Sequence, residues 1–180
     1  MRRRSHFELK HVSSNDIRMD ETMKTKEKTN VMRVLDSKKI TYTSHSYEAD
    51  PSLSGGEIAG ILGEDQACVF KTLVTQGKSG AYYVFVVPVE AELDLKKAAK
   101  AASEKSISMI KQKELLPLTG YVHGGCSPIG MKKRFPIFIH ETASSFEKVF
   151  VSAGKVGYQI ELAPTDLISV TECKLADIIP

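Results

Sequence analysis

This 180-residue sequence has no long apolar run: no continuous hydrophobic stretch reaches the length that spans a bilayer. The apolar runs that exist, such as residues 82–88, have the length of buried strands. An excess of one charge is also missing, because 25 Lys and Arg stand against 22 Asp and Glu. Composition therefore excludes a transmembrane helix and leaves any contact with RNA to a local patch.

Cysteine is scarce as well. Cys68, Cys126 and Cys173 are widely spaced and never form a CxxC pair. Without a secretory signal, this usage is typical of a reduced, cytoplasmic protein, in which each cysteine is a small buried side chain.

The motifs of three enzyme classes are missing. Gly154-Lys155 lacks the upstream glycine and the following Ser or Thr of a phosphate-binding loop. His45, His123 and His140 stand alone, without the close spacing of a metal site, and no Gly-x-Ser-x-Gly elbow occurs. These absences argue against a nucleotide hydrolase, a zinc enzyme and an α/β-hydrolase, and we expect neither a metal nor a cofactor.

The N-terminal residues differ from the rest of the chain. Residues 1–22 open with three arginines and continue as a polar stretch without helical or strand periodicity. They lack the apolar core of a signal peptide, and their acidic residues argue against an organellar presequence. We expect residues 1–22 to be a disordered extension and residues 23–180 to form a single domain, because two domains would be cramped in this length.

The remaining pattern predicts helices and strands in a mixed order. The sequence favours a helix from Asn30 to Lys39, a strand over 40–47, a helix over 55–62 between Ser54 and Gly63, strands over 68–76 and 81–88, helices over 93–103 and 111–116, strands over 137–140, 149–152 and 159–162, and a closing helix from Pro164. Because strands and helices do not alternate as βαβ units, we expect an α/β mixed (α+β) fold with a curved, barrel-like mixed β-sheet surrounded by helices.

Lys71 is the first candidate for a functional side chain. In a strand, Val69, Lys71 and Leu73 share one face, so a charge sits between two apolar neighbours. Such a lysine either lies at a sheet edge and reaches water, or lies at the floor of a pocket and binds a phosphate or an oxyanion. The strand pattern leaves both interpretations open.

Two glycine-rich segments are the next candidates. Residues 120–130 contain four glycines and one proline, so the backbone can approach a ligand closely and direct its N–H groups at negative charge. In residues 151–162, two glycines bracket Lys155 before an alternating strand. A wide surface turn and a plain hairpin are the alternatives. Cys126 has no evident histidine partner, so we do not expect it to be a nucleophile.

In order and spacing, these segments resemble the YbaK family of aminoacyl-tRNA deacylases, which is related to the editing domain inserted in bacterial prolyl-tRNA synthetases. The likeness covers nearly everything from residue 29 to residue 180 and is greatest to the branch that clears cysteine from tRNA for proline. The matching stretches are residues 45–48, 69–73, 88–89 with 93–97, 120–130 with Lys132 and Lys133, 151–157 and 160–162.

The resemblance implies a pocket for the aminoacyl-adenosine end of tRNA. In that pocket Lys71 is the central, catalytic polar group, and the residues expected to contact substrate are Tyr47, Gly124, Gly125, Ser127, Pro128, Gly154 and Gln159. Some family members carry Asp where this chain has Gln159. A glutamine amide forms hydrogen bonds but cannot act as a base, so we expect it only to contact the substrate.

The resemblance also implies a trans-editing deacylase that removes cysteine mischarged onto tRNA(Pro), with Cys-tRNA(Cys) as a further substrate. The thiol of the bound cysteine supplies the nucleophile. Aminoacyl-tRNA and prolyl-tRNA synthetase are the expected partners, in the cytoplasm. Two alternatives stay open: a deacylase for Ala-tRNA(Pro), and a non-catalytic RNA-binding or regulatory module on the same fold.

Overall fold

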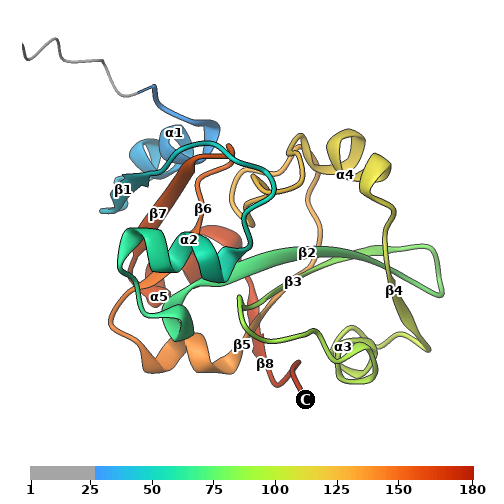
Figure 1. Ribbon diagram of the computed structural model, residues 1–180. Helices are drawn as coiled ribbons and strands as arrows, with labels where there is room; N and C mark the ends of the chain where they lie inside the picture. The colour runs from blue at the N-terminus through green and yellow to red at the C-terminus, as the bar shows by residue number, and fades with distance from the viewer. Residues whose placement is uncertain (1–26) are drawn as a thin grey trace, which may run out of the picture.

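The computed structural model describes residues 27–180, so the predictions for residues 1–22 and for a domain start at residue 23 lie outside the described residues. Within this range the chain forms helices and strands in mixed order (Figure 1). The α-helices are α1 (Asn30–Ser37), α2 (Gly55–Leu62), α3 (Leu95–Ala101), α4 (Gln112–Thr119) and α5 (Pro164–Thr171). The strands are β1 (Thr43–Ser46), β2 (Phe70–Gly77), β3 (Tyr82–Pro88), β4 (Ile107–Met109), β5 (Ile137–His140), β6 (Val149–Ser152), β7 (Tyr158–Leu162) and β8 (Lys174–Ala176). Two 3-10 helices, η1 (Gln66–Cys68) and η2 (Glu141–Ser145), complete the set.

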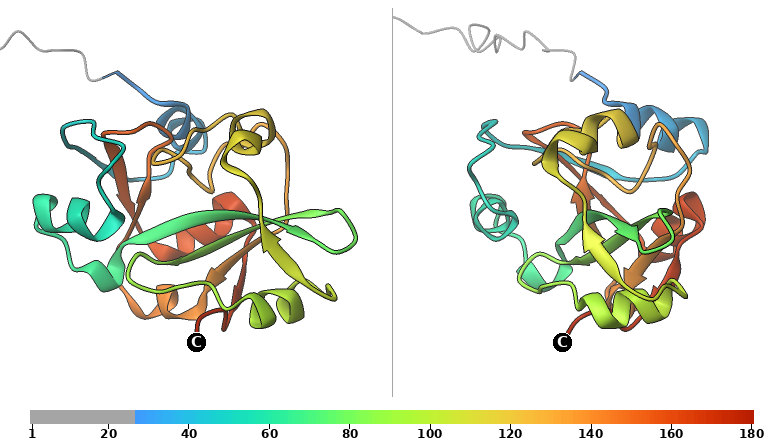
Figure 2. Two further views of the ribbon diagram at one scale, coloured as in Figure 1. Left: turned by 45° about the vertical axis from the view of Figure 1, so that its right-hand side comes forward. Right: turned by 90° about the vertical axis from the view of Figure 1, so that its right-hand side faces the viewer.

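The strands form two sheets. β1, β7 and β6 make an antiparallel three-stranded sheet, and the second sheet has the order β4-β2-β3-β5-β8 with both parallel and antiparallel pairs. The predicted mixed α/β architecture is confirmed, with helices around the outside of the sheets (Figure 2). The sheets do not close into one barrel. β6 is an edge of its own sheet, and one isolated bridge, Val69–Phe150, joins it to the residue before β2, so no continuous ladder of hydrogen bonds connects the two sheets.

Local sequence signals explain the position of α2, which borders the site described below. The Ser54 hydroxyl accepts a hydrogen bond from the Glu57 backbone N–H, and the Glu57 carboxylate accepts one from the Ser54 N–H. Gly63 ends the helix in the left-handed conformation, at φ 68°. The predicted bounds of α2 are therefore confirmed.

The first helix, for which the sequence predicts Asn30 as the N-cap, is capped one residue earlier. Thr29 is the N-cap, because its hydroxyl accepts a hydrogen bond from the Met32 N–H. The Asn30 side chain instead donates to the Gly130 carbonyl at 3.0 Å. This contact joins the N-terminal helix to the glycine-rich loop over 120–130.

Strand β3 is the centre of the molecule and is buried on both faces. Val84 and Val86 belong to the larger apolar cluster, which includes residues of α1, β6 and β7. Phe85 and Val87 face a smaller cluster with α3 and the C-terminal Ile178. The alternation of the strand thus divides the core into two parts.

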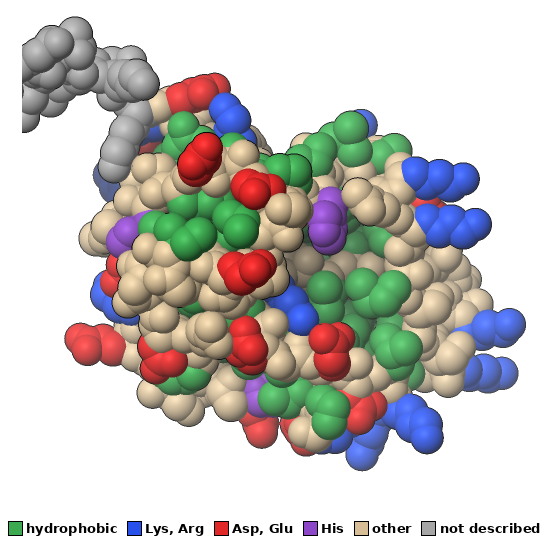
Figure 3. Space-filling model, viewed as in Figure 1, with side chains coloured by type: hydrophobic (Ala, Val, Ile, Leu, Met, Phe, Trp, Pro, Cys, Tyr) green, Lys and Arg blue, Asp and Glu red, His purple; other side chains and the backbone are tan. Residues whose placement is uncertain are grey.

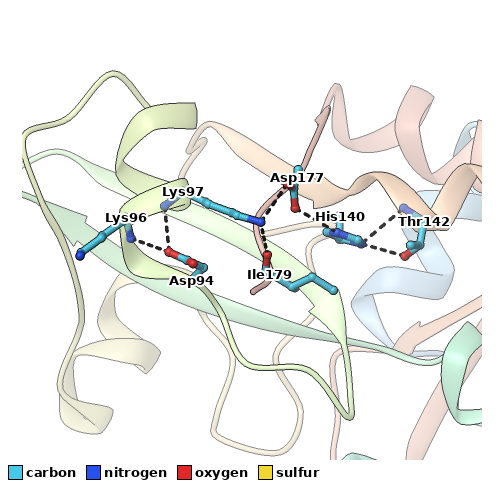
Figure 4. A network of polar contacts seen from close by, with 7 residues as sticks. All are labelled: Asp94, Lys96, Lys97, His140, Thr142, Asp177 and Ile179. Atoms are coloured by element: carbon cyan, nitrogen blue, oxygen red, sulfur yellow. Dashed lines mark hydrogen bonds and ion pairs between the residues drawn. The ribbon is translucent and has the colours of Figure 1, made fainter.

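The end of the chain is fixed to the domain by a polar network (Figure 4). The Lys97 ammonium in α3 lies 2.9 Å from an Asp177 carboxylate oxygen and donates to the Ile179 carbonyl at 2.6 Å. His140, at the end of β5, places Nε2 3.7 Å from Asp177 and Nδ1 2.8 Å from the Thr142 hydroxyl. The hydrogen bond from Lys97 holds the pKa of Asp177 below its ordinary value.

Candidate functional site

A cavity of about 280 Å³ opens between α2, the start of β2, β7 and the glycine-rich loop over 120–130. Figure 3 shows the hollow near the middle of the face on which α2 lies. Four of the predicted site residues line it together: Tyr47, Lys71, Gly124 and Gln159. They come from four segments of the chain that are far apart in sequence, which the fold brings to one wall.

The other four predicted residues, Gly125, Ser127, Pro128 and Gly154, do not line the cavity. Gly154, at φ 88°, is pressed against the core, since a Cβ atom there would lie 2.8 Å from the Tyr121 ring. A Cβ at Gly125 would lie 3.0 Å from the Val156 backbone nitrogen. These two glycines allow close approach of the backbone to protein rather than to a ligand.

Ser127 and Pro128 are buried behind the cavity wall. The Ser127 hydroxyl accepts a hydrogen bond from the Ile129 N–H at 3.3 Å, which closes the loop on itself. The Tyr121 hydroxyl donates to the Ile129 carbonyl at 2.5 Å. The loop is therefore a rigid support that presents Gly124 to the cavity.

Lys71 lies near the start of β2, opposite Val87 of β3. The other neighbour of β2 in the sheet, β4, pairs only with the far end of the strand. Its side chain keeps 30% of its surface exposed and lines the cavity. The ammonium is 3.8 Å from a carboxylate oxygen of Glu92, whose own side chain is 90% exposed. An exposed partner at that distance contributes little, so the ammonium is available to a ligand.

Tyr47 approaches the cavity from the end of β1. Its backbone N–H donates to the Gly157 carbonyl at 2.9 Å, which fixes the chain between β1 and α2 against the turn before β7. Ser152, His123 and Tyr158 also line the cavity. None of these three is among the residues predicted to contact substrate, although each lies inside or beside a segment that carries the family resemblance.

Gln159 lies at the centre of the three-stranded sheet, opposite His45 on β1 and Ser152 on β6, and is 5% exposed. With its amide nitrogen toward Glu64, it donates to both carboxylate oxygens at 2.6 and 2.8 Å. His45 Nε2 lies 2.8 Å from a Glu161 carboxylate oxygen beside them. No sequence pattern indicates Glu64, which follows the end of α2.

Burial raises the pKa of Glu64 to about 7. The nearby charge of His45 and the hydrogen bond from Gln159 oppose this rise, whereas the negative charge of Glu161 adds to it. The cavity therefore has behind its wall a carboxyl group that changes protonation state near neutral pH.

Cys126 is the cysteine on the cavity wall, and burial raises the pKa of its thiol to about 12. The thiolate, which is the nucleophilic form, is thus disfavoured. No hydrogen bond joins Cys126 to a histidine in the described part of the chain. The Ser54 hydroxyl is engaged in the cap of α2, and the Ser152 hydroxyl accepts from the Gly154 N–H.

Residues 27–180 contain neither a cluster of metal-ligating side chains nor a helix that could span a membrane. No three His, Cys, Asp or Glu side chains gather there closely enough to hold a metal ion. None of the helices formed by these residues is both long and apolar enough to cross a membrane.

The chain is similar to proteins that act on tRNA. The family model of the aminoacyl-tRNA editing domain matches residues 54–170. EbsC of Enterococcus faecalis, a protein named for the deacylation of Cys-tRNA(Pro) and Cys-tRNA(Cys), is 45% identical over 156 residues, which are 86% of this chain and 95% of EbsC.

Two solved structures share the fold. A crystal structure described as a trans-editing enzyme for prolyl-tRNA synthetase has a TM-score of 0.73 at 23% identity, over 84% of this chain and 95% of the other. The hypothetical protein APE2540 has a TM-score of 0.77 at 22% identity, over 84% of this chain and 99% of the other. At these identities the likeness supports the architecture.

Proposed function

This chain belongs to the aminoacyl-tRNA editing domain family, and on that premise we propose that it removes cysteine mischarged onto tRNA(Pro), with Cys-tRNA(Cys) as a further substrate. The observation that carries the proposal is the 45% identity to EbsC over nearly the whole of both chains, since EbsC is named for these two substrates. The cavity with Lys71 at its wall supplies a site for the reaction.

Translation needs such an activity for a physical reason. Proline, cysteine and alanine differ little in volume, and one methylene is worth only about 1–3 kcal/mol in a binding pocket. A prolyl-tRNA synthetase therefore cannot reject every cysteine by binding alone. A second site that hydrolyses the wrong ester corrects the error, and we propose the synthetase as the partner that passes on the mischarged tRNA.

The cavity wall favours a nucleophile that comes with the substrate. Cys126 is held as a thiol, and Ser54 and Ser152 are engaged in local hydrogen bonds. In the proposed reaction the sulfur of the bound cysteine attacks its own ester carbonyl carbon. A C–S bond forms, the C–O bond to the ribose breaks, and the thiol proton ends on the ribose oxygen. The cyclic thioester that leaves is then hydrolysed by water.

We assign Lys71 to the charge that develops during this attack. As the carbonyl carbon becomes tetrahedral, its oxygen gains negative charge, and a preorganised cation nearby stabilises it. The ammonium is partly desolvated by the cavity, and among residues 27–180 its only ion-pair partner is the distant, exposed Glu92. Its attraction for an oxyanion is therefore little reduced by competing ion pairs.

The charge distribution suggests how the tRNA lies. Residues 48–65, which include α2, contain five carboxylates and no Lys or Arg, whereas residues 95–113, from α3 to the start of α4, contain six lysines and one carboxylate. Figure 3 shows blue side chains along the right-hand edge of the molecule, on the α3 and α4 side, and red ones toward the α2 side. Because phosphate contacts dominate nucleic-acid affinity, we propose that the acceptor stem lies along the lysine-rich side.

We propose further that residues 23–180 form the deacylase domain, that residues 1–22 extend it without contributing to the reaction, and that catalysis requires neither metal nor cofactor. The cytoplasm is the proposed compartment. Cys68, Cys126 and Cys173 are all free thiols, which suits a reducing environment.

Single-turnover deacylation by Lys71 variants tests the proposed function. Lys71→Ala is expected to lower the rate by roughly 10²–10³, the cost of a lost oxyanion donor. Folding should be unharmed, because the substitution removes a charge from between apolar neighbours. Lys71→Arg is expected to fail substantially, since a planar guanidinium does not fit where a compact ammonium points. Lys174→Ala, at an exposed position outside both the cavity and the lysine-rich segment 95–113, is the control.

Separately charged Cys-tRNA(Pro) and Ala-tRNA(Pro) complete the experiment. Rapid release of cysteine alone supports the proposal, and rapid release of alanine alone identifies an alanine deacylase. Binding of tRNA without release of either amino acid identifies a non-catalytic module. Near-normal rates in both Lys71 variants contradict the assignment of Lys71, whatever the amino acid.

A further inference from the structure

We propose that Glu64 is a positioning residue: its carboxylate fixes the Gln159 amide so that the amide oxygen faces the cavity and accepts a hydrogen bond from the ammonium group of the esterified amino acid. The inference rests on the proposed function, because the ammonium group belongs to the aminoacyl-tRNA. It gives the site a means of recognising the amino acid through its α-amino group, in addition to the ester.

The contact between the two side chains determines the orientation of the amide. An ionised carboxylate only accepts hydrogen bonds, so the group that meets both of its oxygens must be the amide nitrogen, at 2.6 and 2.8 Å. Nitrogen and oxygen share one planar carbon, which turns the Gln159 oxygen away from Glu64. Gln159 is 5% exposed and lines the cavity, and in the proposal this oxygen is the atom that it presents there.

The backbone at both ends of this contact is fixed. Glu64 follows the left-handed Gly63, and its N–H donates to the Ala59 carbonyl at 2.8 Å, as part of the end of α2. Gln159 is in the middle strand of its sheet, with β1 on one side and β6 on the other. With the backbone held at both ends, the contact with Glu64 selects the orientation of the Gln159 amide.

The charges around Glu64 favour a cation next to the Gln159 amide, on the side that faces away from Glu64. No lysine or arginine among residues 27–180 forms an ion pair with Glu64. The charged groups that face it are His45 from β1 and Glu161 from β7, which pair with each other at 2.8 Å. A carboxylate without a cationic partner, next to a cavity, attracts an ammonium group through the polarised amide.

Protonation of Glu64 should loosen the arrangement. A protonated carboxyl gains an O–H donor, which can donate to the amide oxygen of Gln159 and allow the flipped orientation. Burial raises the pKa of Glu64 to about 7, so this change occurs near neutral pH. Recognition of the ammonium group should weaken as the pH falls through that value.

The decisive comparison uses two substrates, Cys-tRNA(Pro) and 3-mercaptopropionyl-tRNA(Pro), which keeps the thiol and the ester but lacks the α-amino group. The wild type should prefer the first by roughly tenfold in kcat/KM, mainly through KM, as expected for one hydrogen bond to a charged group. Glu64→Gln should reduce this preference toward one. Glu48→Gln, which removes an exposed carboxylate without a partner in the described chain, should retain it.

The pH dependence adds a second readout on the same proteins. Ionisation of the substrate thiol affects the wild type and Glu64→Gln alike, so it cancels in the ratio of their rates on Cys-tRNA(Pro). That ratio should fall as the pH falls through about 7. A merely structural role for Glu64 would alter melting temperature but would leave both the substrate preference and this ratio unchanged.

An NMR titration tests the contact without any activity. The side-chain NH2 resonances of Gln159, identified by their loss in Gln159→Leu, should shift with a midpoint near pH 7 in the wild type and not in Glu64→Gln. A wild type without this titration, or a Glu64→Gln variant that cleaves Cys-tRNA with the full wild-type preference, overturns the inference and leaves the proposed function standing. A wild type that cleaves neither ester refutes the proposed function, and the titration then decides whether Glu64 orients Gln159.

Discussion

Glu64→Gln should stabilise the protein at alkaline pH, although we expect it to weaken recognition of the substrate. The ordinary pKa of this carboxyl is 4.5, and burial raises the pKa in the folded protein to about 7. The folded state therefore holds the proton more tightly than the unfolded state, and ionised Glu64 costs stability. The loss of stability caused by ionised Glu64 is absent below pH 4.5, grows between pH 4.5 and about 7, and has its full size above about pH 7. Glutamine has nearly the same shape and carries no charge.

The size of the effect follows from the same values. At about 1.4 kcal/mol for each pKa unit, the rise from 4.5 to about 7 corresponds to at most about 3–4 kcal/mol. Glu64 is partly exposed, so solvent screens much of this, and we expect about 1–2 kcal/mol at pH 8. For a domain of this size that is a rise in Tm of roughly 3–6 °C.

Thermal unfolding of the wild type and Glu64→Gln between pH 4.5 and 8.5 is the assay. The difference in Tm should be close to zero at the acid end and reach its full value above about pH 7. A variant that is less stable than the wild type at pH 8, or a difference in Tm that does not change with pH, would refute the reasoning. Glu48→Gln should show neither the gain nor the pH dependence.

Three further predictions concern the rest of the site. Cys126→Ser should keep the wild-type rate, because burial holds the thiol protonated; loss of activity in a folded variant would identify a catalytic thiol. Gly154→Ala should lower the free energy of unfolding by about 1–3 kcal/mol, measured in urea, since φ is 88° and a Cβ would meet Tyr121 at 2.8 Å. Changing Lys111 and Lys113 to Ala together should raise KM for tRNA and flatten its salt dependence, and an unchanged salt slope would move the acceptor stem to another face.

Much of the fold follows from local signals in the sequence. The Ser54 cap and Gly63 define α2, and apolar runs bounded by turns define β5 and β6 with the predicted ends. β4 and β8 were not predicted. Each has three residues and exists because a neighbouring strand offers its edge: β4 pairs with the end of β2, and β8 pairs with β5. Strands so short carry no alternation that a sequence pattern could detect.

Without the family resemblance, which supplies Tyr47 and Gln159, a polar side chain of the site is predictable only where it contradicts its surroundings. Lys71 interrupts an apolar strand, and that conflict can be read without knowing the neighbours. Glu64 gives no such sign, since a glutamate after a helix-ending glycine looks like any solvated turn residue. Its role depends on Gln159, which is far away in sequence and is brought beside it only by the packing of α2 against the three-stranded sheet.

A glycine in the sequence indicates the conformation of the backbone, but it does not show whether the residue contacts a ligand. Gly124, Gly125 and Gly154 look alike in the sequence, because each indicates a backbone that a side chain would obstruct. What lies next to each glycine is determined by the fold. Protein atoms lie against Gly125 and Gly154, whereas the cavity opens beside Gly124. A glycine-rich segment therefore predicts close approach of the backbone to something, and only the neighbouring elements decide whether that is a ligand or the core.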